Sequence, residues 1–175
     1  MTEEEVRIRS VYLFVACAHA VEQCKDQLIS TVPHTPPLSS TPLLDKLLRR
    51  ELGLLFRYWT TRKIWERLES SEVDAKNLNL AVLRLFVEGF KLPKDGSGLR
   101  YAELSTPVEE ARELSHRITD ALGMEHQPLL AQLQGGIVSW RDSVLTHTID
   151  ALERPVDELT SKVKQWAERA PEAST

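Results

Sequence analysis

Cysteine is scarce in this sequence of 175 residues, and its two copies, Cys17 and Cys24, stand seven positions apart. On a helix that spacing puts both thiols on one face but about 10 Å apart, which is too far for a disulfide between them. Small, apolar free thiols of this kind usually serve as packing residues rather than redox or metal-binding groups. They also favour a reducing compartment, so we expect a cytoplasmic protein.

Long apolar runs are lacking as well. The densest apolar segment, from Val11 to Val21, is interrupted by His19 and falls far short of the ~20 residues needed to cross a bilayer. Three glutamates, Glu3 to Glu5, stand where a secretory signal would carry positive charge. We therefore expect neither export nor membrane association.

Glycine is sparse, with seven copies, and the sequence contains no convincing phosphate-binding loop. Gly96, Ser97 and Gly98 with the nearby Arg100 are the closest approach to one. The dinucleotide fingerprint, however, requires a strand before its glycines and a helix after them, and no strand-period segment longer than a few residues occurs here. The run from Asp95 to Gly98 is therefore interpreted as a turn.

The composition that remains is that of an ordinary globular chain, with 42% hydrophobic residues, 27% charged residues and a formal net charge of -4. This amount of apolar side chain is sufficient for one core. The overall charge is typical neither of a polyanionic tail nor of a globally basic nucleic-acid binder. Composition thus indicates one domain and leaves the class of partner open.

Apolar residues recur at helical spacing along most of the sequence, which predicts an all-α fold: a single-domain bundle of about five to seven helices over residues 1–170. The first helix begins with the capping-box pattern of Thr2 and Glu5 and continues to Ile29. Three prolines among serines and threonines then predict an irregular loop over residues 30–41.

The second helix is predicted from Thr41, followed by a proline suited to the first helical position, to Leu68. The third follows a cap at Ser71 and reaches Phe90. In the first and third helices apolar residues cover more than a single stripe. Both are therefore predicted to lie at the centre of the bundle.

A turn-rich segment over residues 92–104 separates the third helix from a fourth. Thr106 and Glu109 repeat the capping-box pattern around a proline, and Gly123 is suited to the left-handed conformation that ends a helix. The fourth helix is therefore predicted between Thr106 and Gly123.

The C-terminal part is predicted to form three shorter helices. One runs from Pro128 to Gln134 and ends at Gly135–Gly136, and the next runs from Ile137 to Leu152. Pro155 starts or kinks the last one, which has an apolar face. Residues 171–175 are expected to be a frayed tail.

The metal candidates are Glu113 and His116, a Glu-x-x-His pair on one helix face with Glu109 one turn before. A ferritin-like di-iron site needs a second such pair, and the sequence contains none. A zinc site built with His126 is chemically possible, but nothing in the spacing requires it. We predict no metal and no cofactor.

His19 stands in an otherwise apolar helix, so it is interpreted as a buried, hydrogen-bonded imidazole or as a residue facing a pocket. A dyad with Cys17 is excluded locally, because neighbours two apart point to different faces of a helix. A ligand-binding or enzymatic cavity around His19, Glu22, Glu113 and His116 remains an alternative.

The most informative feature is the second helix, where Pro42 to Leu68 carry seven Lys or Arg against three Asp or Glu. This local net charge of +4 belongs to a chain whose net charge is -4. Aromatic residues interleave with the cations, a combination that suits protein recognition and base stacking. The candidate partner-binding residues are Lys46, Arg49, Arg50, Arg57, Arg62, Lys63 and Trp65.

Three interpretations of these cations are open. They form a solvated face paired with internal acids such as Glu109, Glu110 and Glu113, they bind an acidic protein, or they bind nucleic acid. We predict a non-enzymatic interaction module, an adaptor, regulator or subunit of a larger assembly, whose partner is a protein with an acidic surface. A nucleic-acid-contacting accessory subunit and a metal- or small-ligand-binding helical enzyme are the alternatives.

Overall fold

A computed structural model describes residues 1–29, 41–96, 98–123 and 126–169. These residues form six α-helices, one short 3-10 helix and no strand, which confirms the predicted all-α fold. The elements are α1 (Glu3–Ile29), α2 (Thr41–Arg67), α3 (Glu72–Phe90), η1 (Leu99–Glu103), α4 (Pro107–Leu122), α5 (His126–Glu153) and α6 (Val156–Arg169). The predicted loop over residues 30–41, apart from Thr41 at the start of α2, and the tail over 171–175 lie outside the described residues.

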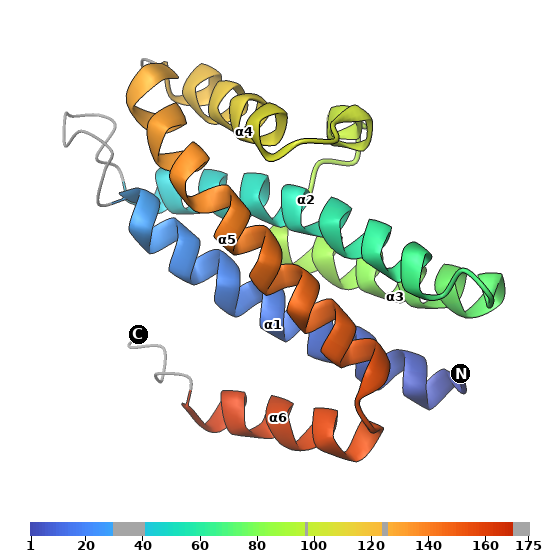
Figure 1. The fold of residues 1–175 in the computed structure, drawn as a ribbon. Helices are drawn as coiled ribbons and strands as arrows, with labels where there is room; N and C mark the ends of the chain where they lie inside the picture. Colours follow the sequence, from blue (N-terminus) through green and yellow to red (C-terminus); the bar gives the residue numbers. More distant parts are fainter. Residues whose placement is uncertain (30–40, 97, 124–125, 170–175) are drawn as a thin grey trace.

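The helices pack around α1 and α2 (Figure 1). Helix α1 contacts α2, α3, α5 and α6, and α2 contacts α1, α3, α4 and α5. Helix α5 crosses over both of them, with α4 on one side of the bundle and α6 on the other (Figure 1). Consequently α2, which carries the predicted basic face, lies inside the bundle.

Helix α3 buries one full face against α1 and α2. Phe86 is completely buried, and its ring meets that of Phe90 edge to face at 5.2 Å between centroids. The other face of α3 is open, with Val73 and Leu80 exposed. Of the two helices predicted to be central, α1 lies at the centre of the bundle. Helix α3 is more peripheral, because α2 and α5 each contact more of the other helices than α3 does.

Side chains predicted to start and stop helices do so in most places. The amide of Thr2 donates to the carboxylate of Glu5 at 2.7 Å, and the amide of Glu5 donates to the Thr2 hydroxyl at 3.1 Å. Thr106 and Glu109 form the same capping box at α4. Gly123 ends α4 with a φ of 65°, in the left-handed region. The local chemistry of these ends was therefore sufficient to predict them.

The break predicted at Gly135–Gly136 is wrong, because α5 is one continuous helix from His126 to Glu153. At Gly136 the reason for a missing side chain is packing. A Cβ there would lie 2.6 Å from the Cζ2 atom of the buried Trp140 indole. That glycine therefore admits a ring one turn further along the same helix instead of ending it.

The chain turns between α5 and α6 next to Pro155. The guanidinium of Arg9 in α1 donates to the carbonyls of Ala151 and Arg154, at 2.6 and 3.0 Å. Ala151 lies in the last turn of α5 and Arg154 directly follows this helix, where acceptors are left without intrahelical partners. Arg9 thereby fixes the turn against α1.

Candidate partner-binding surface

Helix α2 is surrounded by the bundle, and its Leu48, Leu52 and Leu55 side chains are fully buried. A helix in this position exposes only short arcs, so its cations emerge on different sides rather than on one continuous face. The predicted binding residues therefore divide into a C-terminal group, Arg57, Arg62, Lys63 and Trp65, and an N-terminal group, Lys46, Arg49 and Arg50.

Two cations of the C-terminal group are engaged within the protein. The Arg62 guanidinium donates to the backbone carbonyl of Tyr101 in η1. The Lys63 ammonium pairs with Glu66 one turn later at 3.1 Å. Arg62 therefore holds η1 onto α2, and neither side chain is free to serve mainly as a contact for a partner.

The aromatic residues of α2 also have separate roles. Arg57 lies 4.7 Å from the ring centroid of Tyr58, a cation–π geometry within the helix itself. Trp59 is buried, whereas the side chain of Trp65 is 41% exposed. Trp65 thus remains available to a partner.

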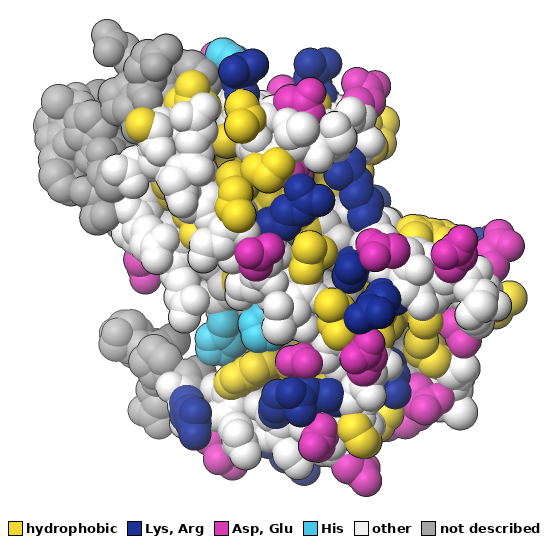
Figure 2. Space-filling view, in the orientation of Figure 1, with side chains coloured by type: hydrophobic (Ala, Val, Ile, Leu, Met, Phe, Trp, Pro, Cys, Tyr) yellow, Lys and Arg dark blue, Asp and Glu magenta, His cyan; other side chains and the backbone are white. Residues whose placement is uncertain are grey.

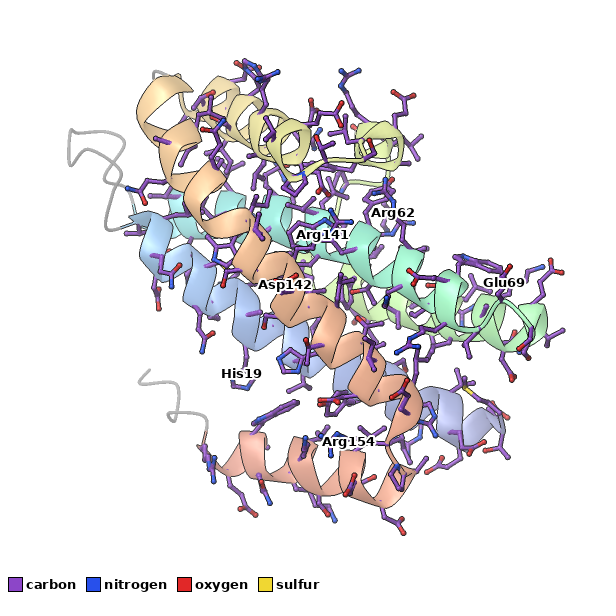
Figure 3. All side chains as sticks on the ribbon, in the orientation of Figure 1. His19, Arg62, Glu69, Arg141, Asp142 and Arg154 are labelled. Carbon is purple, nitrogen blue, oxygen red and sulfur yellow. The ribbon has the colours of Figure 1, made fainter. Side chains whose placement is uncertain are left out.

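A buried carboxylate lies between α2, α4 and α5. Glu110 is 1% exposed and accepts from the Trp59 indole N–H and from Arg141 at 3.3 Å. Arg62 of α2 and Arg141 of α5 approach this region from neighbouring helices (Figure 3). Burial raises the pKa of Glu110, against the opposing effects of the Trp59 hydrogen bond and of Arg141. This acid is part of the core and serves helix packing.

The metal candidates are not assembled into a site. Glu113 pairs with Arg100 at 3.3 Å, and Glu109 accepts from the Thr106 amide in its own capping box. The side chain of His126 is outside the described part. Within the residues that the structure describes, no group of three or more His, Cys, Asp or Glu side chains is placed to hold a metal ion.

His19 is exposed, so its interpretation as a buried core histidine is wrong. Its ring centroid lies 5.7 Å from that of Trp166 in α6, and His147 of α5 lies 6.3 Å from the same indole. Figure 2 shows histidine side chains in the hollow where α6 meets the rest of the molecule, and Figure 3 labels His19 there. Glu22 pairs elsewhere, with Lys25 and Arg49. The alternative of a cavity that joins His19 and Glu22 to Glu113 and His116 is therefore not supported by the packing of the described residues.

The two thiols are packing groups, as predicted. Cys17 and Cys24 are free and buried. Burial raises the pKa of each to about 12. A thiol with such a pKa is almost entirely protonated at neutral pH, so neither cysteine is suited to act as a nucleophile.

The N-terminal cations of α2 are less fully neutralised. Arg49 pairs with Glu22 of α1 at 2.6 Å. Arg50 reaches the carboxylate of Glu51 at 3.3 Å, but that carboxylate is 2% exposed and is already held by Arg117 of α4 at 2.6 Å. Two guanidinium groups therefore share one carboxylate. Arg50, which is 42% exposed, keeps an excess of positive charge at the surface.

Arg50 and Lys46 line a pocket of about 320 Å³ together with Lys91, the residue that ends α3. Neither lysine ammonium group has a hydrogen bond or an ion pair with any other residue that the structure describes. The remaining described lining residues are apolar: Leu47, Ala121 and Leu122. We call this site the basic pocket. Its described walls hold three cations, three aliphatic side chains and no carboxylate.

Lys91 enters the basic pocket from an uncommon backbone conformation. Its φ is 56°, and it is the only non-glycine residue with a positive φ in the described part of the chain. Its amide donates to the carbonyl of Val87 and closes the end of α3. Glycine is the usual residue in such a left-handed cap, because a Cβ is disfavoured there. A lysine at this position therefore carries a conformational cost.

Comparison with protein-family models, with curated protein sequences and with solved structures gave no match for this chain. Among the helices of the described residues, none combines the length and the apolar character needed to cross a membrane.

Of the residues that line the basic pocket, the sequence pattern named Lys46 and Arg50 as candidates but not Lys91 or Ala121. Lys91 lies more than 40 positions beyond Lys46, and only the packing of α3 and α4 beside α2 brings these residues together. A lysine directly after the predicted end of a helix was the one local signal available. It is also the place where a cation commonly stabilises the helix dipole, so by itself it does not indicate a binding site.

Proposed function

We propose that this protein is a helical interaction module, an adaptor, regulator or subunit of a larger assembly, that binds an acidic segment of another protein at the basic pocket. The observation that carries this proposal is the charge of the pocket. Lys46, Arg50 and Lys91 converge there from α2 and α3, and none of the described residues in the lining supplies a negative charge.

The contrast with the other cations of α2 supports this choice. Arg49 and Lys63 each pair with a carboxylate, and Arg62 donates to a carbonyl. Such side chains contribute to the fold or to its surface. Three cations that line one hollow repel one another, and an acidic partner relieves that repulsion while accelerating association.

A protein partner fits the arrangement better than nucleic acid. Binding along a nucleic-acid backbone uses an extended basic track with accessible aromatic rings for stacking. Here the cations of α2 point to different sides, Trp59 is buried, and Trp65 stands near the opposite end of the helix from Lys46. A single hollow with three cations suits one or two carboxylates instead. We place this interaction in the reducing cytoplasm, as the free thiols suggest.

The experiment is affinity capture from cells of the source organism, with the partner identified by mass spectrometry and its yield measured against salt concentration. The test variant is Lys46→Glu with Lys91→Glu, which breaks no ion pair among the described residues. The control is Lys76→Glu with Arg112→Glu. It changes the net charge equally at two exposed positions outside the basic pocket.

We expect the test variant to lose a partner that the wild type and the control both retain, and we expect added salt to weaken that capture. The proposal is wrong if the test variant retains every captured protein at unchanged yield. It is also wrong if the wild type instead shows tight, salt-dependent binding to labelled oligonucleotides that the test variant loses.

A further inference from the structure

The basic pocket has an apolar wall that a purely electrostatic contact does not need. Leu47 contributes from α2, and Ala121 and Leu122 contribute from the last turn of α4. The Ala121 side chain is exposed, and Leu122 is partly exposed. An occupant that placed only a carboxylate near the lysines would leave this wall in water. The walls therefore favour an occupant that joins an anionic group to an aliphatic one.

The size of the basic pocket limits how those two groups can be arranged. At about 320 Å³ it lies near the lower end of the range for ligand sites, which is roughly 300 to 1,000 Å³. Neighbouring side chains of an extended peptide point to opposite sides, so an acidic residue and the next aliphatic residue cannot both enter one small hollow. The last residue of a chain avoids this restriction, because it carries a carboxylate and a side chain on the same Cα.

We propose that the basic pocket binds the free carboxyl terminus of a partner chain that ends in an aliphatic residue such as leucine. This inference rests on the proposed function and specifies the chemistry of its partner. The terminal carboxylate is bound by Lys46, Arg50 and Lys91, and the terminal side chain packs on Leu47, Ala121 and Leu122. An acidic residue just before the terminus strengthens the attraction to the three cations.

Lys91 is the residue through which this specificity is set. It lines the pocket from the C-terminal end of α3, in a left-handed backbone conformation, whereas Lys46 and Arg50 line it from α2. Glycine adopts this left-handed backbone conformation without strain, but it has no side chain and so carries no cation. Lys91→Gly should therefore preserve the fold while weakening peptide binding.

The test is a titration of the full-length, dye-free protein with the peptide Gly-Ser-Gly-Asp-Leu, which has a free carboxyl terminus. Binding is measured from the amide chemical shifts of the protein and, separately, by calorimetry. One comparison peptide carries a carboxamide at the terminus, and a second ends in serine. We expect both comparison peptides to bind about tenfold more weakly or not at all. The largest shifts should lie at Lys46, Lys91 and Ala121.

Two protein variants separate the two halves of the pocket. Ala121→Phe fills the apolar side without changing charge, and we expect it to weaken the leucine peptide about tenfold while leaving the serine peptide unchanged. Lys91→Gly should weaken the binding of both peptides that have a free carboxyl terminus, the leucine peptide and the serine peptide. Far-ultraviolet circular dichroism must show the native helix content for both variants, which is expected because Ala121 and Lys91 are exposed.

Equal affinity for the acid and the carboxamide overturns this inference, and so does a wild type that binds no peptide at concentrations up to several millimolar. These outcomes differ from a failure of the proposed function. If the peptides fail while Lys46→Glu with Lys91→Glu still abolishes capture of the native partner, the pocket binds an acidic segment that is not a chain terminus.

Discussion

Two adjacent glycines of α5 should respond in opposite directions to the same substitution. Gly135 and Gly136 both lie inside the helix, where replacing glycine by alanine stabilises by up to about 1 kcal/mol through backbone entropy. A Cβ at Gly135 would meet nothing within 4 Å. A Cβ at Gly136 would lie 2.6 Å from the Trp140 indole, and that ring is 9% exposed and has little room to move.

We therefore expect Gly135→Ala to raise the free energy of unfolding by about 0.5 to 1 kcal/mol. Overpacking a well-filled site costs about 1 to 3 kcal/mol, which exceeds the helix gain, so Gly136→Ala should lower the free energy of unfolding by up to about 2 kcal/mol. Both changes can be measured by urea unfolding monitored by circular dichroism. The slope of the unfolding free energy against urea concentration should be the same for both variants and the wild type.

A second mutation checks the cause. In a Trp140→Leu background the indole is absent, so Gly136→Ala should become neutral or stabilising relative to that background. If both alanine variants destabilised the wild type by similar amounts, the glycines would instead be ending a helix, and the continuous α5 would be wrong. If both stabilised it, Trp140 would not be packed against Gly136.

Three further predictions concern the core and pH. Phe86→Ala should lower the free energy of unfolding by about 3 to 5 kcal/mol, and a loss below about 1 kcal/mol would contradict the complete burial of Phe86. Burial raises the pKa of Glu110, so the folded state holds its proton more tightly than the unfolded state. Stability should therefore fall as pH rises from the ordinary value of 4.5 through the raised pKa, and Glu110→Gln should remove that slope in urea titrations. For His147, burial lowers the pKa, against the opposing effect of Asp150, so the folded protein should lose stability as the pH drops below the ordinary value of 6.5. If the free energy of unfolding had the same slope against pH in the wild type and in His147→Asn, this prediction would be refuted.

The sequence was most informative where a structural feature depends on neighbours along the chain. The capping boxes at Thr2 and Thr106 and the left-handed cap at Gly123 require only residues within one turn, and they are present as predicted. Gly135 and Gly136 show the limit of the same reasoning. A glycine pair resembles a helix stop in the sequence, and only the position of Trp140 explains Gly136 as a packing residue.

The residues of the candidate surface could be grouped only in part from the sequence, because charge counting cannot identify partners that are distant along the chain. Arg49 is neutralised by Glu22, 27 positions earlier, and Arg62 donates to Tyr101, 39 positions later. Conversely, Lys46 and Lys91 form one site although nothing in the local sequence links them. Net charge along the sequence singled out α2 as the candidate helix, whereas a choice among its cations required the tertiary fold.

Contact between the basic pocket and a partner protein can be tested in cells by site-specific photo-crosslinking. A photoreactive phenylalanine analogue at Ala121, on the exposed wall of the pocket, is compared with the same analogue at Val138, an exposed residue of α5 that does not line it. We expect that only position 121 crosslinks to a partner in cells, and that the crosslinked peptide is acidic and lies at the partner's carboxyl terminus. Crosslinking from position 138 with none from position 121 would contradict it.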